Sequence, residues 1–380
     1  MSSTRRRKDN EGDSIMSKMR NRINRRDFLY KAGLAGAAMA AGPILSACAK
    51  AAPEAAPAAS DAEPSGPKRT LVWNSPFVAP WELPLVTGYN DFCSALGWEF
   101  IHTGASEYSI EIRHREITNS IALNPDVLTT DLNDGPALGP LLVDAMEQGI
   151  KVIVAEGGDS KWALDHDLPV YVADAFSQGR RYGKKVCDLV IDHFGKTEGI
   201  IAIGDLNPGG MPILDQIRGI ELAVQTYNEE KGTNFTTDVF PDAALEGVAP
   251  QYAKVESTYE KNRDTLVALV GTGIFDGQLL WQKDQGFVGE NRPFIAANWD
   301  FPELHLNALE EGYLDFLIQA NLYGLGWGPA AQAWMWVERG FLPDNVLQPG
   351  ELISTAEDIA RITERDEIWK EAARDYGLAV

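Results

Sequence analysis

The sequence predicts an α/β fold built from two Rossmann-like, doubly wound lobes, and three observations support this. From Thr70 to about residue 320, short β-rich runs alternate with longer helical patterns. The β-rich runs are almost continuously apolar, which is typical of strands covered by helices on both faces. The alternation continues for about 250 residues, more than one open sheet usually holds, so two lobes are expected.

The predicted strands and helices alternate regularly along the body of the chain. Strands are expected at residues 71–74, 97–103, 126–130, 150–156, 169–173, 199–205, 236–240, 266–271, 294–299 and 315–320. Helices are expected near residues 84–96, 108–123, 136–148, 175–194, 211–229, 250–262, 276–285 and 302–311. Gly149 and Gly195 mark the ends of two of these helices. Strands joined by helices in this order form parallel βαβ units.

The composition excludes several classes of protein. The 380 residues are 44% hydrophobic and 23% charged, which argues against extensive disorder. The formal net charge is −21, so nucleic acid is not an expected partner. Three cysteines are too few for a disulfide framework or a Cys₄ zinc site. Cys93 and Cys187 lie in half-apolar helical patterns and are expected to be buried thiols.

Residues 1–48 have the features of an export signal. They carry 10 Lys and Arg residues against 4 Asp and Glu residues, and a weakly apolar stretch runs from Gly33 to Leu45. Arg25 and Arg26, in the run NRRDFL, resemble the twin-arginine export motif. The run LSAC resembles a lipobox, in which Cys48 would be acylated. We therefore expect an extracytoplasmic protein, in the periplasm or at the cell surface, anchored to the membrane by lipid at Cys48.

Residues 49–69 are rich in Ala, Pro and Ser and show no periodic pattern. Such a composition is typical of a flexible, partly extended linker. We expect this linker to hold the folded body away from the lipid surface.

Polar and aromatic side chains follow the predicted strands where a ligand would bind. In doubly wound sheets, ligands bind beyond the carboxyl ends of the strands. The candidate ligand-binding residues there are Asn74, Phe77, Trp81, Asp131, Asn207, Asp276, Trp299, Asp300, Gln319 and Asn321. Carboxylates and amides can bind several hydroxyl groups, and aromatic faces suit the C–H faces of a sugar ring. Few cations occupy these positions, which disfavours anionic ligands. Alternatively, individual Asp and Asn residues here serve as helix N-caps.

The motifs for catalysis are weak. The sequence contains no HExxH, GxSxG or P-loop motif, and its five histidines are scattered. The glycine-rich run from Gly271 to Gly277 carries Asp276 where a dinucleotide fingerprint needs a small residue. We expect no cofactor, no metal site and no enzymatic activity.

Three stretches resemble one family, the ribose-binding-like (type I) periplasmic solute-binding proteins of ABC sugar importers. They are PALGPLLVDAMEQGIKVIVAE (136–156), PVYVADAFSQGRRYGKKVCDLVI (169–191) and FIAANWDFPELHLNALEEGYLDFLIQANLYGLG (294–326). They occur in the family's order and spacing, and the resemblance extends from about Thr70 to Leu342. Within residues 348–380, the run ELIST also resembles the family's last strand. The resemblance leaves the final helix unassigned.

The resemblance implies two lobes joined by a three-crossing hinge, with a sugar or polyol between them. The crossings are expected near Ala173, Gln319 and Pro343. That assigns residues 70–173 and 319–342 to lobe 1, and residues 174–318 and 343–380 to lobe 2.

The resemblance also implies roles for single residues. Asp300 matches the family's ligand-binding aspartate, and Asp131 matches a polar position after the third strand. An ungapped match puts Ala320 at the family's binding glutamine, so either Gln319 or Asn321 takes that role.

These observations together predict a monomeric, lipid-anchored binding protein that delivers a neutral sugar or polyol to ABC permease subunits. One alternative is a sensory receptor of the same fold, for a quorum signal or for chemotaxis. Another is a secreted oxidoreductase or hydrolase. The lac-repressor family shares the fold, but no stretch here resembles its DNA-binding headpiece.

Overall fold

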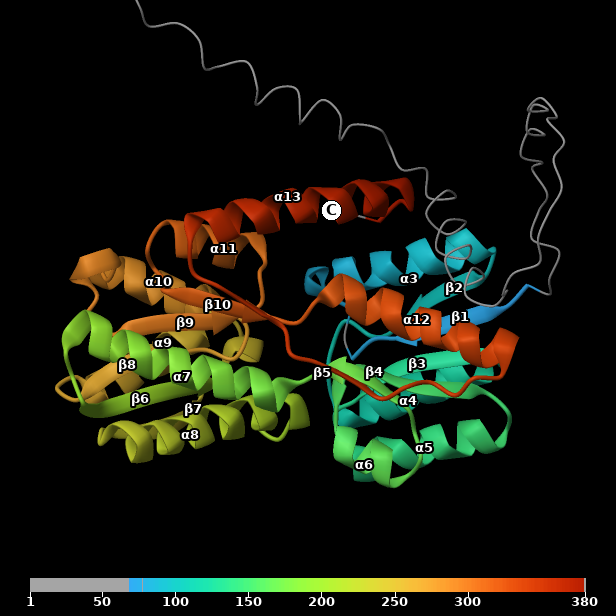
Figure 1. Cartoon of the computed structure of the whole chain (residues 1–380), viewed down its shortest axis with the longest axis horizontal. Coiled ribbons are helices and arrows are strands. Elements are labelled where there is room, and N and C mark those ends of the chain that lie inside the picture. The colour runs from blue at the N-terminus through green and yellow to red at the C-terminus, as the bar shows by residue number, and fades with distance from the viewer. Residues whose placement is uncertain (1–67, 77, 379–380) are drawn as a thin grey trace, which may run out of the picture. The chain divides into compact units, whose positions relative to one another are not determined.

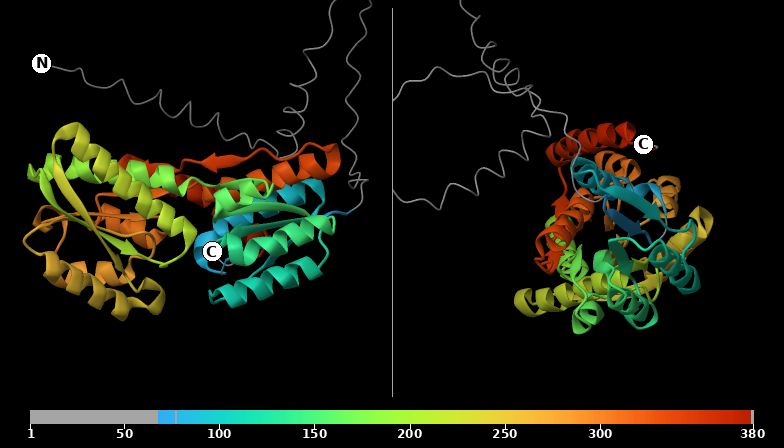
Figure 2. Two further views of the ribbon diagram at one scale, coloured as in Figure 1. Left: turned by 90° about the horizontal axis from the view of Figure 1, so that it is seen from below. Right: turned by 90° about the vertical axis from the view of Figure 1, so that its right-hand side faces the viewer.

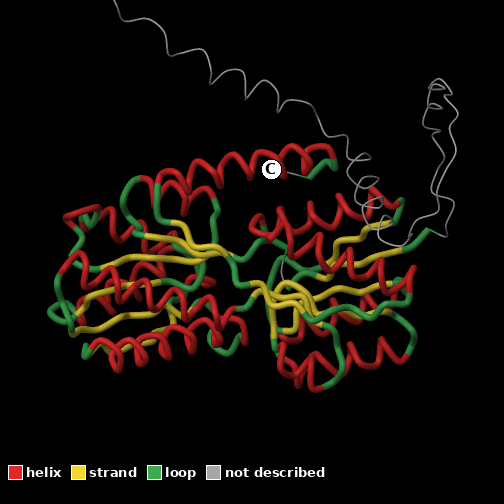
Figure 3. The backbone as a smooth tube through the Cα atoms, viewed as in Figure 1, coloured by secondary structure: helices red, strands yellow, loops and turns green. Residues whose placement is uncertain are grey.

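The computed structural model describes residues 68–76 and 78–378 (Figure 1). The predicted signal segment, almost all of the predicted linker and Phe77 lie outside the described residues. The described chain contains two six-stranded sheets with helices packed around each (Figure 3). The α/β fold class with two doubly wound lobes is therefore confirmed.

The first sheet has the strand order β11-β5-β4-β3-β1-β2, and all its strands pair in parallel. Its strands are β1 (Thr70–Asn74), β2 (Glu99–Thr103), β3 (Val127–Leu132), β4 (Lys151–Gly158), β5 (Val170–Ala173) and β11 (Val346–Gln348). The helical segments of this lobe are η1 (Pro80–Glu82), α3 (Leu83–Leu96), α4 (Ile110–Ala122), α5 (Gly135–Glu147), α6 (Ser160–Asp165) and α12 (Leu322–Arg339). We call this sheet with these helices the first lobe.

The second sheet has the order β12-β10-β9-β8-β6-β7, with β12 antiparallel and the other strands parallel. Its strands are β6 (Glu198–Asp205), β7 (Asn234–Pro241), β8 (Leu266–Val270), β9 (Ile295–Trp299), β10 (Phe316–Gln319) and β12 (Glu351–Ile353). The helical segments are α7 (Ala175–Phe194), α8 (Met211–Lys231), η2 (Ala244–Glu246), α9 (Val248–Asn262), α10 (Asp276–Gln285), η3 (Gly289–Asn291) and α11 (Glu303–Glu310). This is the second lobe. The last helix, α13 (Ala356–Asp375), follows β12.

The apolar strands bury both of their faces, as the sequence predicts. In β1, Leu71 and Trp73 pack in one core cluster and Val72 packs in the cluster on the opposite face. In β6, Ile201 lies in one cluster and Ala202 in the other. This two-residue alternation places one apolar layer on each side of both sheets.

The chain changes sheet three times, after β5, after β10 and after β11. The first two changes coincide with the crossings expected near Ala173 and Gln319. The third differs from the expectation near Pro343, because β11 pairs with β5 and aligns Val346 with Tyr171. Residues 346–348 therefore belong to the first sheet, and the crossing lies between Gln348 and Glu351. Figure 2 shows the C-terminal segment passing from one sheet to the other.

Helices α3 and α12 cross so closely that only glycine fits at their contact. A β-carbon on Gly326 would lie 1.9 Å from the carbonyl oxygen of Leu85, and one on Gly88 would lie 2.3 Å from the carbonyl oxygen of Tyr323. Both partner atoms belong to the backbone and cannot rotate away. The first lobe therefore depends on small residues in both helices at this crossing.

We expect Gly326→Ala to lower the free energy of unfolding by about 1–3 kcal/mol, because the added methyl group overlaps backbone. Urea unfolding followed by circular dichroism measures this change. Gly157→Ala is the matched control, since a β-carbon there would meet only the Pro212 side chain at 3.5 Å. Equal unfolding midpoints for the two variants would contradict the close-packing explanation.

Candidate functional site

Acidic side chains from both sheets gather at the carboxyl ends of the parallel strands. Asp131 lies one residue before the end of β3, Glu156 lies near the end of β4, and Asp300 directly follows β9. The negative charges of Asp131 and Asp300 both act on Glu156, so the strand ends of the two lobes lie within electrostatic range of each other. The N–H of Met211 at the start of α8 also donates to the carbonyl oxygen of Asn133, at 3.4 Å. These strand ends form the candidate site.

Asp131 is held by a fully buried ion pair. Its carboxylate pairs with Arg113 of α4 and accepts a hydrogen bond from the Asn133 side chain. The Arg113 guanidinium also donates to the carbonyl oxygen of Ser75 and, at 3.0 Å, to the Thr130 hydroxyl. Burial raises the pKa of Asp131, and the guanidinium opposes that rise. The pair therefore fixes one carboxylate in position at the end of β3.

Arg113 is not among the residues that the strand ends predict, although the sequence contains a signal for it. It lies three residues after Ile110 and four before Ile117. Residues at this spacing share one face of a helix, and Arg113 and Ile117 are both fully buried. An arginine on an inward apolar face needs a buried partner. Here that partner is Asp131.

Glu156 is the most strongly perturbed carboxylate of the site. Burial, with the charges of Asp131, Asp300 and Glu82, raises the pKa of Glu156 to about 8. Its φ of 69° lies in the left-handed region, which non-glycine residues rarely adopt. The fold thus holds this carboxyl group on a residue with an unfavourable backbone conformation and in an unfavourable electrostatic environment. This combination is common at functional sites.

Asp300 occupies the equivalent place in the second lobe. Its φ is 65°, and its N–H donates to the carbonyl oxygen of Ile318 on the neighbouring strand at 2.8 Å. Burial raises the pKa of Asp300 to about 6, although a hydrogen bond with the Gln319 side chain lowers it. Gln319 ends β10, immediately before the second crossing. The structure therefore brings the predicted Asp300 and Gln319 together.

Asn321 has a different role, that of a helix N-cap. Its side chain accepts a hydrogen bond from the N–H of Gly324, at 3.0 Å, in the first turn of α12. Of the two residues expected to replace the family's glutamine, only Gln319 therefore contacts Asp300 in the described structure. The capping alternative applies to Asn321.

Trp299 packs in the core of the second lobe instead of presenting its ring at the strand ends. It is 2% exposed, and its ring stacks on that of Tyr182 with centroids 4.4 Å apart. Its indole N–H donates to the Gln178 side chain at 3.1 Å. The sequence-based role in ligand stacking is corrected here, because a large ring at the end of an apolar strand gains more from core packing.

Asn74 is also committed to internal contacts. It is fully buried, and its amide donates to the hydroxyls of Thr103 and Ser120, each at 3.0 Å. Its side-chain oxygen is 3.4 Å from the hydroxyl of Thr130. The predicted ligand contact is thus replaced by a network that fastens β1 to β2 and α4.

The other predicted residues differ in their exposure and contacts. Asp276 is exposed in the first turn of α10. Asn207 is partly buried after β6, where its N–H donates to the Asp205 carboxylate at 3.1 Å. Trp81 is partly buried in η1 and packs against the core of the first lobe. Phe77 lies outside the described residues.

Glu82 and Asp242 are buried carboxylates that the sequence-based list also lacked. Glu82 accepts hydrogen bonds from the indole N–H of Trp73 at 3.3 Å and the N–H of Ala79 at 3.2 Å. It thereby fastens the segment that leads from β1 to α3. Asp242, after β7, accepts from the N–H of Ala244 at 2.8 Å, and burial raises the pKa of Asp242 to about 6.

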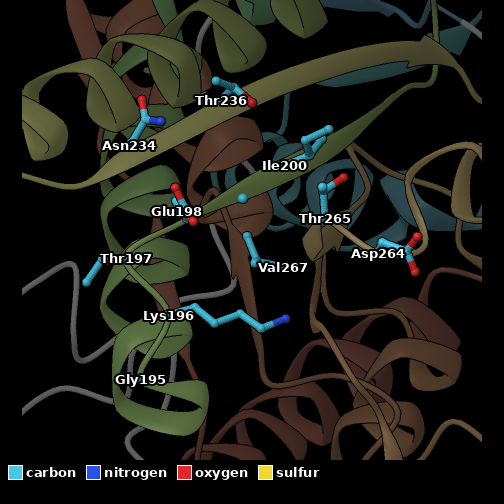
Figure 4. Close-up of a pocket in the computed structure, with 11 residues that line it drawn as sticks. Gly195, Lys196, Thr197, Glu198, Ile200, Asn234, Thr236, Asp264, Thr265 and Val267 are labelled. Atoms are coloured by element: carbon cyan, nitrogen blue, oxygen red, sulfur yellow. The ribbon is translucent and has the colours of Figure 1, made fainter.

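A separate open pocket of about 630 Å³ lies at the opposite, amino ends of β6, β7 and β8 (Figure 4). Charges of both signs line it, from Lys196, Glu198 and Asp264. Since ligands of doubly wound sheets bind at the carboxyl ends, this pocket is not the candidate site.

The family model of the periplasmic binding protein domain matches residues 72–339. The chain belongs to this family. The fold is that of the type I, ribose-binding-like members, as the resemblance implies. Proteins of this family bind ligands and are not enzymes, and the family implies an extracytoplasmic location. No curated protein matches the sequence.

Solved structures share the fold at low sequence identity. A solute-binding protein of an ABC transporter from Agrobacterium vitis, bound with α-D-tagatopyranose, has a TM-score of 0.67 and 17% identity, over 77% of this chain and 98% of that chain. A carbohydrate transporter from Acidothermus cellulolyticus, in complex with myo-inositol, has a TM-score of 0.63 and 14% identity, over 80% and 99%. A transcriptional regulator of the LacI type from Bacteroides fragilis has a TM-score of 0.63 and 15% identity, over 78% and 99%.

Within residues 68–76 and 78–378, no helix is long and apolar enough to cross a membrane. The same part of the chain contains no group of three or more His, Cys, Asp or Glu side chains arranged to hold a metal ion.

The raised pKa of Glu156 predicts a pH-dependent effect of Glu156→Gln on stability. The unfolded chain releases this proton near its ordinary pKa of 4.5, whereas the folded protein keeps it until about 8. Between these values folding takes up a proton, so stability falls as the pH rises. We expect Glu156→Gln to match the wild type below this window and to exceed its free energy of unfolding by about 5 kcal/mol above it.

Urea unfolding at a series of pH values measures the difference. Glu198→Gln is the control, because Glu198 is exposed at the start of β6. If the difference in free energy of unfolding between Glu156→Gln and the wild type stayed constant with pH, the buried, acidic environment assigned to Glu156 would be contradicted.

Proposed function

We propose that this chain is the extracytoplasmic substrate-binding protein of an ABC importer and that it binds a neutral sugar or polyol between the strand ends of its two lobes. The observation that carries the proposal is the convergence of Asp131 and Glu156 from one sheet with Asp300 from the other. Carboxyl groups brought together from two lobes can exchange hydrogen bonds with several hydroxyl groups of one ligand.

The charge of the site supports an uncharged ligand. The guanidinium of Arg113 is already occupied by Asp131 and by the carbonyl oxygen of Ser75. A phosphate or carboxylate ligand would be repelled by the Asp300 carboxylate, which is ionised at neutral pH because its pKa is raised only to about 6. Hydroxyl groups carry no such penalty, since they can donate to the Asp300 carboxylate and accept from the Glu156 carboxyl group, which keeps its proton up to about pH 8. The α-D-tagatopyranose and myo-inositol of two similar structures are ligands of this kind.

Binding of this type makes and breaks no covalent bond. The ligand bridges the lobes and shifts their equilibrium toward the closed arrangement, which the permease recognises. A micromolar affinity corresponds to about −8 kcal/mol, which a dozen hydrogen bonds can supply after desolvation. The three crossings allow the lobes to move as rigid bodies.

We expect Asp300→Ala to abolish binding, because ligand hydroxyls lose their acceptor in a buried site. Thermal melting against a library of sugars and polyols identifies the ligand, and titration calorimetry gives its affinity for each variant. Asp264→Ala, an exposed substitution in the amino-end pocket, is the control. If no sugar or polyol raises the melting temperature of the wild-type protein, the proposal fails. If a ligand is found and Asp300→Ala binds it normally, the site assignment fails.

We also propose that lipid at Cys48 anchors the protein to the membrane, on the evidence of the run LSAC and the preceding apolar stretch. Cys48→Ser should move the protein from the membrane fraction to the soluble fraction. Cell fractionation followed by immunoblotting measures this redistribution. Continued membrane retention of the variant would refute the anchor.

A further inference from the structure

Helix α13, which the family resemblance leaves unassigned, contacts both lobes. It lies against α11 of the second lobe and α3 of the first (Figure 1). Its first half belongs to the second lobe, because Ile362 is fully buried in the cluster that includes β8, β9 and β10, and Ile359 packs against that cluster. Arg361 and Arg365 pair with Glu351 of β12 at 2.6 and 3.2 Å. This end of the helix is thus fixed to the second sheet.

The second half of α13 is fixed to the first lobe. Ala372 and Ala373 are buried, at 3% and 0% exposure. Just beyond the helix, the Tyr376 hydroxyl donates to the Asp91 carboxylate of α3 at 2.6 Å, and Leu378 packs against the core of the first lobe. Small residues let the helix approach closely, and the hydroxyl and Leu378 then fasten its end.

Asp91 is the point at which three helices meet. One carboxylate oxygen accepts from Tyr376, and the other accepts from Tyr323 of α12 at 2.7 Å. The Tyr323 bond lies within the first lobe, whereas the Tyr376 bond joins the segment anchored in the second lobe to the first. Separation of the lobes would therefore leave the Tyr323–Asp91 hydrogen bond intact and would break the Tyr376–Asp91 hydrogen bond.

We propose that α13 is a strap that limits the separation of the two lobes in the unliganded protein. A helix of 20 residues spans about 30 Å, and it is stiff over that length. With its first half held by Ile362 and by the ion pairs to Glu351, the lobes can move apart only if Tyr376 leaves Asp91 and Leu378 leaves its core. The strap adds a fourth connection to the three crossings of the chain.

The strap has a consequence for ligand affinity. A protein that spends more time with its lobes near the bound arrangement loses less free energy on closure, so its apparent affinity is higher. The residues that set this population, Asp91, Tyr376 and Leu378, lie on and beside α3 and α13, away from the carboxylates of the candidate site. They therefore act on binding without contacting the ligand.

The distance between the lobes tests the proposal without any ligand, so its outcome does not depend on the proposed sugar. Spin labels at Asn119→Cys in α4 and Glu221→Cys in α8, both exposed, report the interlobe distance by pulsed electron paramagnetic resonance. The full chain is used with Cys48→Ser, and the two other cysteines are buried. Tyr376→Phe is compared with Tyr323→Phe, which removes a hydroxyl from the same carboxylate but within one lobe.

We expect Tyr376→Phe to raise the ratio of separated to joined lobes by roughly tenfold or more, the usual effect of losing one hydrogen bond to a charged group. Tyr376→Phe combined with Leu378→Ser should raise it further, while Tyr323→Phe leaves the distance distribution as in the wild type. Hydrogen exchange of residues 370–378 shows whether the end of the helix has been released.

If hydrogen exchange shows that the helix end is released in the double variant and the interlobe distance is unchanged, the proposal is overturned. In that case α13 would be only a surface helix. A distance distribution that responds equally to Tyr323→Phe and Tyr376→Phe would also overturn it. Neither distance measurement needs a ligand, so failure of the proposed sugar site would leave this test unaffected. Weaker ligand binding in Tyr376→Phe, with the lobes more often separated, is the expected effect of the strap on affinity.

Discussion

The structure depends on how the chain is held where it passes between the two sheets. At the third crossing, the N–H of Asp174 donates to the carbonyl oxygen of Gln348 at 2.7 Å, and Arg181 donates to the carbonyl oxygens of Pro349 and Gly350 at 2.7 and 3.0 Å. Gln178 donates to the Gln348 carbonyl at 3.3 Å. These bonds tie the first turns of α7 to the segment between β11 and β12. They hold the carboxyl ends of the two sheets opposite each other, which is the condition for a shared site.

The acidic site is costly to the folded state, and the rest of the lobe compensates for it. Glu156 and Asp300 combine left-handed backbone with burial of a carboxyl group, and both features lower stability. Four core clusters, one on each face of each sheet, supply the opposing apolar burial. The apolar burial around both sheets therefore offsets the free-energy cost of holding these carboxyl groups at the strand ends.

Most of the central strands were predictable because they are apolar runs that need cover on both faces. The residues facing the site were harder to predict, because position after a strand does not say where a side chain points. Trp299 and Asn74 each stand at the end of a strand, yet the side chains of both form hydrogen bonds inside the protein. Arg113 contributes from a helix, which a search of strand ends omits. Strand β11 was missed because three residues of an edge strand carry no periodic signal, and only its pairing with β5 reveals it.

Ligand contact and lobe movement are mechanically linked in this fold. Asp300 directly follows Trp299, whose indole N–H is bound by Gln178, and Gln178 in turn holds the backbone of the third crossing. Asp300 also contacts Gln319 at the second crossing. A ligand that hydrogen-bonds to the Asp300 carboxylate therefore contacts a residue whose neighbours hold two of the three crossings. The contacts of the strap with the first lobe lie outside this network, because they are made on α3 and on the core beside it. Affinity can accordingly be adjusted through α13 while the hydrogen bonds that recognise the ligand stay the same.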